Sequence, residues 1–231
     1  MATSPAGPPG RPALAAPFVA IAALVATVLA ASVAAHRSTP RIRVACVGDS
    51  ITEGRDIPDP ALRYPARLQA LLGGRHEVRN FGVGGATALS TGDLPYRRQP
   101  PFARALAFRP DVVVIGLGSN DAKPWNWSGR GAFADDLRAL AETFRSVNPG
   151  ARVILLLPPP VVGEGRFGIR EEVVAGEVAP EIDRAARESG LEVVDLHAVL
   201  AGRLDLLPDR VHPDAEGAER IARAVAAAIL R

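Results

Sequence analysis

Apolar runs alternate with helical patterns from about residue 41 to the C-terminus. Five apolar runs predict strands, at residues 41–47, 76–82, 111–118, 151–157 and 191–196. The third run, "DVVVIGLG", is apolar throughout, which is typical of a strand buried on both faces. Between the runs, apolar side chains recur at helical spacing, and turn residues such as Gly73 and Gly74 end the helices. The helices are expected at residues 64–72, 99–108, 133–147, 171–190 with a break near Pro180, and 214–230.

Strand and helix alternate five times, which predicts a parallel sheet covered by helices on both faces. The simplest such architecture is a flavodoxin-like, three-layer α/β/α sandwich with a five-stranded parallel sheet. Ligands of these folds bind beyond the carboxyl ends of the strands, at the topological switch point. The candidate site therefore lies in the loops at 48–60, 82–98, 118–131, 158–170 and 197–213.

Four of these loops carry residues that suit acyl transfer. Ser50 follows the first strand, and its hydroxyl needs a base to become a nucleophile. His212, in the last loop, is that base, and Asp209 three residues earlier can accept the other ring N–H. Donors for an oxyanion are expected from the Ser50 backbone N–H, the Gly85 backbone N–H and the Asn120 side-chain amide.

Other polar residues near this edge have competing interpretations. His197, which follows the fifth strand, is the alternative base, although capping or local packing is its expected role. Asp49 is expected to bond to nearby loop backbone, and Asp121 to order its own loop. The stretch "GEGRFGIR", with Arg166 and Arg170, is expected to form a mobile rim.

Trp125 and Trp127 lie together in the third loop, beside the single lysine, Lys123. The two tryptophans either pack locally or form an aromatic wall for a sugar face or an acyl chain. Lys123 is either a solvated cation or a contact for an anionic group of the substrate.

Several other classes of site are absent from the sequence. A G-x-G-x-x-G nucleotide loop fails because Thr87 stands at its last glycine, and no G-K-[ST] or G-x-S-x-G motif occurs. No His, Cys and carboxylate cluster has metal-ligand spacing, so no metal or cofactor is expected.

The blocks "GDS" at Ser50, "GGAT" at Gly85, "GSND" at Asn120 and "DRVH" at Asp209 and His212 occur together and in order. This chain thereby resembles the SGNH, or GDSL-type, serine esterases over nearly everything after residue 40. The stretches "RYPARLQALLG", "VRNFGVGGAT", "GSNDAKPWNW" and "LPPPVV" are similar to its sialate O-acetylesterase-like, or carbohydrate esterase, branch.

The resemblance implies hydrolysis of small acyl esters, above all O-acetyl groups on carbohydrate, by the residues already singled out. A lysophospholipase or thioesterase of the same superfamily is the alternative enzyme. The non-enzyme alternative is a binding module that has kept the fold and lost the catalytic activity. That alternative predicts that at least one of the four sequence blocks is missing, whereas all four are present.

The first 37 residues form a separate leader. Residues 1–12 have the composition of a disordered segment, and residues 13–35 carry no charge over a length that can span a bilayer. We expect either an uncleaved membrane anchor or a long secretory signal; a buried core helix is the alternative, against which the missing polar face argues. More arginines follow the apolar segment than precede it, and by the positive-inside rule this distribution argues against export of the C-terminal domain. We nevertheless favour an extracytoplasmic location for the domain at 38–231.

The charge and the cysteine content limit the kinds of binding partner and the disulfides that the sequence allows. Residues 1–43 hold four of the 27 basic residues and none of the 25 acidic ones, so the rest has a formal net charge of −2. The sequence therefore indicates no nucleic-acid surface, and an ester substrate is the expected partner. The single cysteine, Cys46, excludes an internal disulfide and is expected in the core. The oligomeric state has no signal in the sequence.

Overall fold

The five predicted strands form one sheet in the order β2-β1-β3-β4-β5, with every neighbouring pair parallel. This confirms the flavodoxin-like order that was predicted from the alternation of elements. The strands are β1 (Ile42–Gly48), β2 (His76–Gly82), β3 (Val112–Gly116), β4 (Arg152–Leu157) and β5 (Glu192–Asp195).

The computed structural model describes Met1 and residues 40–231, and residues Arg41–Arg231 make up the folded unit. The leader predicted at residues 1–37, with its apolar segment at 13–35, lies almost entirely outside the described residues. Among the helices that are described, none has the length and apolar character needed to cross a membrane.

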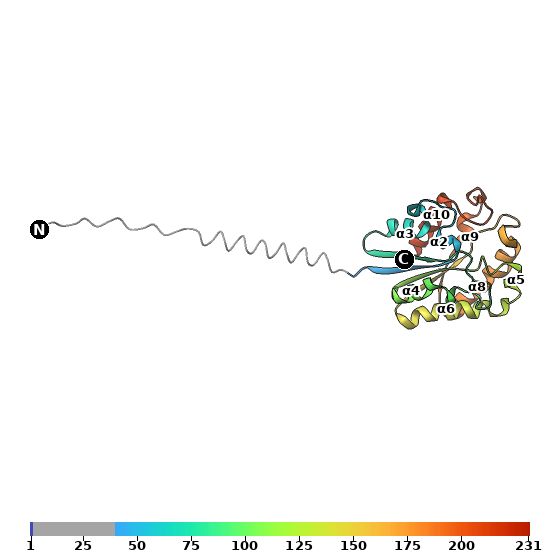
Figure 1. Cartoon of the computed structure of the whole chain (residues 1–231), viewed down its shortest axis with the longest axis horizontal. Coiled ribbons are helices and arrows are strands. Elements are labelled where there is room, and N and C mark those ends of the chain that lie inside the picture. Colours follow the sequence, from blue (N-terminus) through green and yellow to red (C-terminus); the bar gives the residue numbers. More distant parts are fainter. Residues whose placement is uncertain (2–39) are drawn as a thin grey trace. The chain divides into compact units, whose positions relative to one another are not determined.

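Helices cover both faces of the sheet (Figure 1). One face packs against α3 (Tyr64–Leu72) and α10 (Ala215–Ile229), and the other against α4 (Pro100–Ala107), α6 (Phe133–Val147) and α8 (Ala179–Ser189). The alternation of side chains along β1 produces these two cores. Val44 and Cys46 join the first cluster, whereas Ala45 and Val47 join the second.

Three short helices follow strands where the sequence predicts only loops. They are α2 (Ser50–Glu53), α5 (Pro124–Trp127) and α9 (Leu196–Leu200), each too short to show a helical period. Asp49 and Asp195 cap two of them by accepting the backbone N–H groups of Ile51 and Ala198. Asp49 thus bonds to nearby backbone, as predicted.

The helical stretch predicted at 171–190 is continuous, and in place of the break expected near Pro180 it contains a π-helical segment just before the proline. It runs as α7 (Glu171–Val173), a π-helical segment at Val174–Val178, and then α8. Pro180 lies in the first turn of α8, directly after the π-helical segment, and proline has no backbone N–H to donate within a helix.

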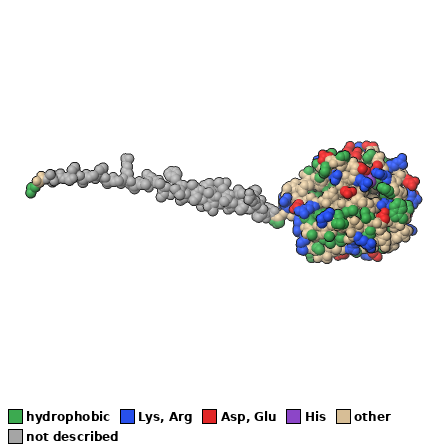
Figure 2. All heavy atoms as spheres, in the orientation of Figure 1, with side chains coloured by type: hydrophobic (Ala, Val, Ile, Leu, Met, Phe, Trp, Pro, Cys, Tyr) green, Lys and Arg blue, Asp and Glu red, His purple; other side chains and the backbone are tan. Residues whose placement is uncertain are grey.

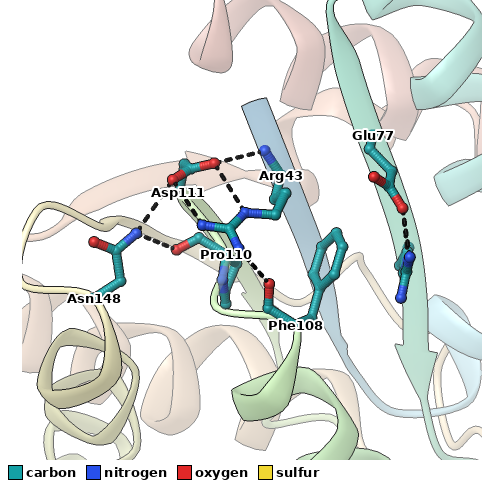
Figure 3. A network of polar contacts seen from close by, with 7 residues as sticks. Arg43, Glu77, Phe108, Pro110, Asp111 and Asn148 are labelled. Carbon is teal, nitrogen blue, oxygen red and sulfur yellow. Dashed lines mark hydrogen bonds and ion pairs between the residues drawn. The ribbon is translucent and has the colours of Figure 1, made fainter. Parts of the chain in front are cut away.

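Polar contacts tie the amino ends of the strands together, at the edge opposite the candidate site (Figure 3). The Asp111 carboxylate accepts the Arg43 backbone N–H at 2.8 Å and a side-chain N–H of Asn148 at 3.2 Å. The Arg43 guanidinium also donates to the Phe108 carbonyl at 3.1 Å. These bonds fix the starts of β1 and β3 to the end of α6. Over the visible face of the folded unit, basic and acidic side chains are interspersed (Figure 2).

Glycines at the carboxyl ends of two strands let α2 lie directly on the sheet. A Cβ at Gly82 would stand 2.2 Å from the Glu53 backbone nitrogen, and one at Gly48 would stand 2.2 Å from the Thr52 hydroxyl oxygen. The first contact is with backbone, so it cannot be relieved by a side-chain rotation. Ser50 opens this helix, and the two glycines therefore set its position.

Replacement of Gly82 by alanine should lower the free energy of unfolding by roughly 1–3 kcal/mol, the usual cost of overpacking a close contact. Gly74→Ala is the matched control, because a Cβ there meets nothing within 4 Å. Urea unfolding of both variants measures the difference. Equal stability of the two variants would show that α2 does not depend on the Gly82 contact.

Candidate active site

Ser50 lies at the start of α2, immediately after β1, and its side chain is almost fully buried. Its Oγ lies 2.8 Å from Nε2 of His212, a residue 162 positions away in the sequence. The helix ends after one turn at Gly54, which has a left-handed φ of 85°. The sharp strand-to-helix turn thus presents the hydroxyl at the carboxyl end of the sheet.

His212 and Asp209 come from the loop before α10. The His212 Nδ1 lies 2.7 Å from Oδ2 of Asp209. The other oxygen, Oδ1, accepts the backbone N–H groups of Val211 at 3.0 Å and His212 at 2.7 Å. Because an ionised carboxylate only accepts, this bond holds the proton on Nδ1 and leaves Nε2 free to accept from Ser50.

Two further charged residues, Arg166 and Asp56, lie beside His212 and Asp209. Neither was predicted from the sequence as a site residue. The Arg166 Nη1 donates to Asp209 Oδ2 at 3.1 Å and lies 3.7 Å from Asp56 Oδ2. Asp56 Oδ2 is 3.9 Å from His212 Nδ1, beyond hydrogen-bond distance, so Asp209 is the carboxylate bonded to the ring. Partial burial acts to raise the pKa of Asp209, but hydrogen bonds from His212 and Arg166 hold it well below its usual range.

A pocket of about 120 Å³ opens beside Ser50. The predicted oxyanion donors Ser50, Gly85 and Asn120 all line it. Gly85 has a φ of 85°, which side chains rarely adopt, so a glycine suits this position. The backbone N–H groups of Ser50 and Gly85 have no acceptor among residues 40–231, and donors facing an open pocket can bind an oxygen of a ligand.

Asn120 is held from two sides. Its Nδ2 lies 3.4 Å from Oδ2 of Asp49, and its backbone carbonyl accepts the side-chain amide of Asn126 at 2.9 Å. Burial raises the pKa of Asp49 to about 6, although hydrogen bonds such as that from the Ile51 N–H and the nearby His212 act to lower it.

The buried carboxylate of Asp121 orders a neighbouring loop. It accepts the backbone N–H groups of Ala88 at 3.0 Å and Leu89 at 2.8 Å, just after Gly85. Burial raises the pKa of Asp121 to about 7, although these two bonds act to lower it. This loop is therefore held by a carboxyl group that titrates near neutral pH.

The two tryptophans have different surroundings. Trp127 is buried, packs edge-on against Phe133 at 5.4 Å and donates its indole N–H to Glu177 at 2.7 Å. It does not line the pocket, so it is a core residue and no part of an aromatic wall there. Trp125 is 55% exposed and donates its indole N–H to Asp93 at 3.1 Å.

Lys123 lines the pocket, and its buried side chain pairs with Asp93 at 3.2 Å. The rings of Trp125 and Phe167 each lie 5.7 Å from its ammonium nitrogen. Phe167 also lines the pocket and is 55% exposed. Phe167 was not predicted as a site residue, because a single phenylalanine in a glycine-rich loop carries no periodic signal.

The remaining described histidines are engaged elsewhere. His197, the alternative base, lies on α9 with Nε2 2.6 Å from Oε1 of Glu171. His76 opens β2 at the far edge of the sheet, where its Nδ1 is 3.1 Å from the Leu72 carbonyl oxygen. Of the histidines in residues 40–231, only His212 contacts Ser50.

Within the described residues, one group of potential metal ligands comes together: Asp56, Asp209 and His212. Both ring nitrogens of His212 are already occupied, by Ser50 and Asp209. The Arg166 guanidinium lies against both carboxylates. Hydrogen bonds and ion pairs thus account for this cluster, and we assign no ion to it.

Comparison with known proteins identifies the class to which this site belongs. Residues 46–220 match the GDSL-like lipase/acylhydrolase family, and the chain belongs to that family of carboxylic ester hydrolases. The resemblance seen in the sequence blocks is thereby confirmed.

Among individual relatives, an acetylxylan esterase from Xylanibacter ruminicola is 38% identical over 206 residues. The match covers 81% of this chain but only 43% of the relative, so the chain spans less than half of that protein. A carbohydrate acetylesterase from Sinorhizobium meliloti matches with a TM-score of 0.68 at 22% identity, over 82% of this chain and 99% of that one. An aryl esterase from M. smegmatis matches with a TM-score of 0.68 at 20% identity, over 81% and 98% of the two chains. The two solved structures share the fold.

The titration of Asp121 predicts a pH-dependent stability. Its pKa is raised from 3.8 to about 7, so the folded state keeps this proton to higher pH than the unfolded chain. The stabilisation is complete below pH 4 and is lost as the pH rises towards 7. Between pH 4 and 7, the Tm of Asp121→Asn should fall by several degrees less than the Tm of the wild type. A change of 1 kcal/mol in the free energy of unfolding shifts Tm by about 2–4 °C for a domain of this size.

Thermal unfolding of wild type and Asp121→Asn at several pH values between 4 and 7 measures the two slopes. Asp135→Asn is the control, because that carboxylate is exposed on α6. Identical slopes for wild type and Asp121→Asn would exclude Asp121 as the titrating group.

Proposed function

We propose that this chain is a serine esterase that removes small acyl groups, principally O-acetyl groups, from carbohydrate. The observation that carries the proposal is the unbroken hydrogen-bond chain from Ser50 through His212 to Asp209, which begins at a pocket. In this proposal Ser50 is the nucleophile, His212 the general base and Asp209 the residue that orients and charge-balances the base.

The proposed reaction has two stages. The Ser50 oxygen attacks the ester carbonyl carbon while its proton passes to Nε2 of His212. The resulting oxyanion receives hydrogen bonds from the Ser50 N–H, the Gly85 N–H and the Asn120 amide. The intermediate then collapses: the bond to the alcohol breaks, and His212 returns its proton to the departing oxygen. Water, activated by His212, hydrolyses the acyl-enzyme and regenerates Ser50.

Two features support a short acyl group on a sugar. A pocket of about 120 Å³ suits an acetyl group better than a long chain. Lys123 and the exposed ring of Phe167 line the pocket, and the exposed ring of Trp125, which is not in the lining, lies 5.7 Å from the Lys123 ammonium nitrogen. These apolar faces and the Lys123 donor form a combination that suits a pyranose. The acetylxylan esterase relative favours the same substrate class.

The alternatives make different demands on the protein. A lysophospholipase or thioesterase needs room for a long acyl chain, which the small pocket does not favour. A silent binding module needs no bonded Ser50–His212 pair. We also propose an extracytoplasmic location, secreted or membrane-anchored, which rests on the uncharged segment at 13–35.

The choice of base predicts unequal effects of two histidine substitutions. His212→Ala should remove esterase activity about as completely as Ser50→Ala, because residues of one catalytic unit are not additive. His197→Ala is the matched control and should keep most of the activity, since that ring bonds to Glu171 instead. Steady-state hydrolysis of p-nitrophenyl acetate measures all three variants. Loss of activity in His197→Ala with retention in His212→Ala would transfer the base to His197.

The substrate class predicts a sharp preference for short acyl groups. The kcat/KM for p-nitrophenyl acetate should exceed that for p-nitrophenyl decanoate, and acetate should be released from acetylated xylo-oligosaccharides. Trp125→Ala should raise KM for the oligosaccharide by roughly fivefold, the effect of about 1 kcal/mol of lost apolar contact, and leave p-nitrophenyl acetate unaffected.

Leu204→Ala, which removes another exposed apolar side chain, 45% exposed compared with 55% for Trp125, is the control for that measurement. Faster hydrolysis of the decanoate would favour the lipid or thioester alternative. An equal change of KM for both acetyl substrates in Trp125→Ala would remove Trp125 from the sugar contact.

A further inference from the structure

Arg166 contacts the end of the hydrogen-bond chain that is farthest from Ser50. It lies in the 3₁₀ turn η4 (Arg166–Gly168), in the loop between β4 and α7. Its Nη1 bonds to the same Asp209 oxygen, Oδ2, that faces the His212 ring. With the two backbone N–H groups on Oδ1, all four acceptor sites of this carboxylate are used.

The backbone around Arg166 is shaped for this contact. Phe167 has a φ of 63°, a left-handed conformation that is uncommon for a residue other than glycine. The Gly165 N–H donates to the Ile169 carbonyl at 2.8 Å across the turn. A Cβ at Gly165 would stand 2.6 Å from Cγ2 of Val211, so the loop packs tightly beside His212. The position of Arg166 is therefore built into the loop.

Two carboxylates face Nδ1 of His212: Asp209 at 2.7 Å and Asp56 at 3.9 Å. Within residues 40–231, Arg166 is the only lysine or arginine that pairs with either carboxylate. The other charged or titratable groups near the ring belong to the pocket wall and to the strand end behind Ser50, namely Arg55, Lys123 and Asp49.

The sign of these charges bears on the proposed base. Two negative charges beside one imidazole favour its protonated form, and a protonated ring cannot accept the Ser50 proton. A guanidinium on the same carboxylates offsets one of those charges and favours the neutral ring. It also holds the Asp209 oxygen against Nδ1 through a charge-assisted bond.

We propose that Arg166 is a positioning residue that holds Asp209 on His212 and offsets the charge of Asp56, so that the net charge of these groups beside the His212 ring is one negative charge and not two. The catalytic consequence rests on the proposed function, whereas the effect on the His212 ring does not.

NMR titration of the histidine rings in the full folded protein tests the proposal without any ester substrate. The His212 signal is assigned by its absence in His212→Ala. Arg166→Met should raise the midpoint of the His212 titration by roughly 0.5–1 pH unit, as expected for loss of one partly screened charge at this range. Asp56→Asn should move the midpoint in the opposite direction, and Arg166→Lys should restore it towards the wild-type value.

Arg170→Met is the matched control, because that arginine lies in the same loop but pairs with Glu172 at 3.0 Å. It should leave the His212 midpoint unchanged. An unchanged midpoint in Arg166→Met, a shift that Arg170→Met reproduces, or no restoration by lysine would overturn the proposal.

The acid limb of kcat/KM for p-nitrophenyl acetate should move with the NMR midpoint in each variant. If the midpoints shift as expected but the wild type hydrolyses no ester, the proposed function fails and the placement of Arg166 stands.

Discussion

The hydrogen bond between Ser50 and His212 joins two residues 162 positions apart, and the fold is what makes them neighbours. A parallel sheet brings the carboxyl ends of its strands to one edge, so the loops after β1, β2 and β3 meet there. His212 comes from a different part of the chain, the loop that precedes α10. Asp214 caps that helix by accepting the Gly217 N–H at 2.9 Å, so the loop is fixed just after His212.

The same edge contains features that oppose stability and favour chemistry. Glycines at the ends of β1 and β2 provide no packing of their own, yet they let α2 approach the strands closely enough to carry Ser50. Asp49 and Asp121 are buried carboxyl groups with raised pKa values, which is unfavourable for folding at neutral pH. Local violations of good packing and charge solvation are expected where function, rather than stability, has shaped a site.

Much of this arrangement was predictable from the sequence, for identifiable reasons. The central strands β3 and β4 are strongly apolar, and the alternation of elements implies the strand order. Ser50, Asn120, Asp209 and His212 each lie within a recognisable sequence block. Arg166 and Asp56 were not predictable as neighbours of His212, because their positions depend on irregular loops with left-handed residues at Asp56 and Phe167. Trp125 and Trp127 are only two residues apart, and sequence alone could not show that one is exposed and the other buried.

In the proposed reaction, Ser50, at the start of α2, is the one activated serine. Labelling of the protein with a fluorophosphonate, followed by mass-spectrometric mapping of the adduct, measures this most directly. The probe forms a bond from the serine oxygen to phosphorus and releases fluoride, so only an activated hydroxyl reacts at an appreciable rate. The account predicts a single adduct on Ser50 that is absent in Ser50→Ala. Labelling of another serine at an equal rate, with Ser50 unmodified, would contradict it.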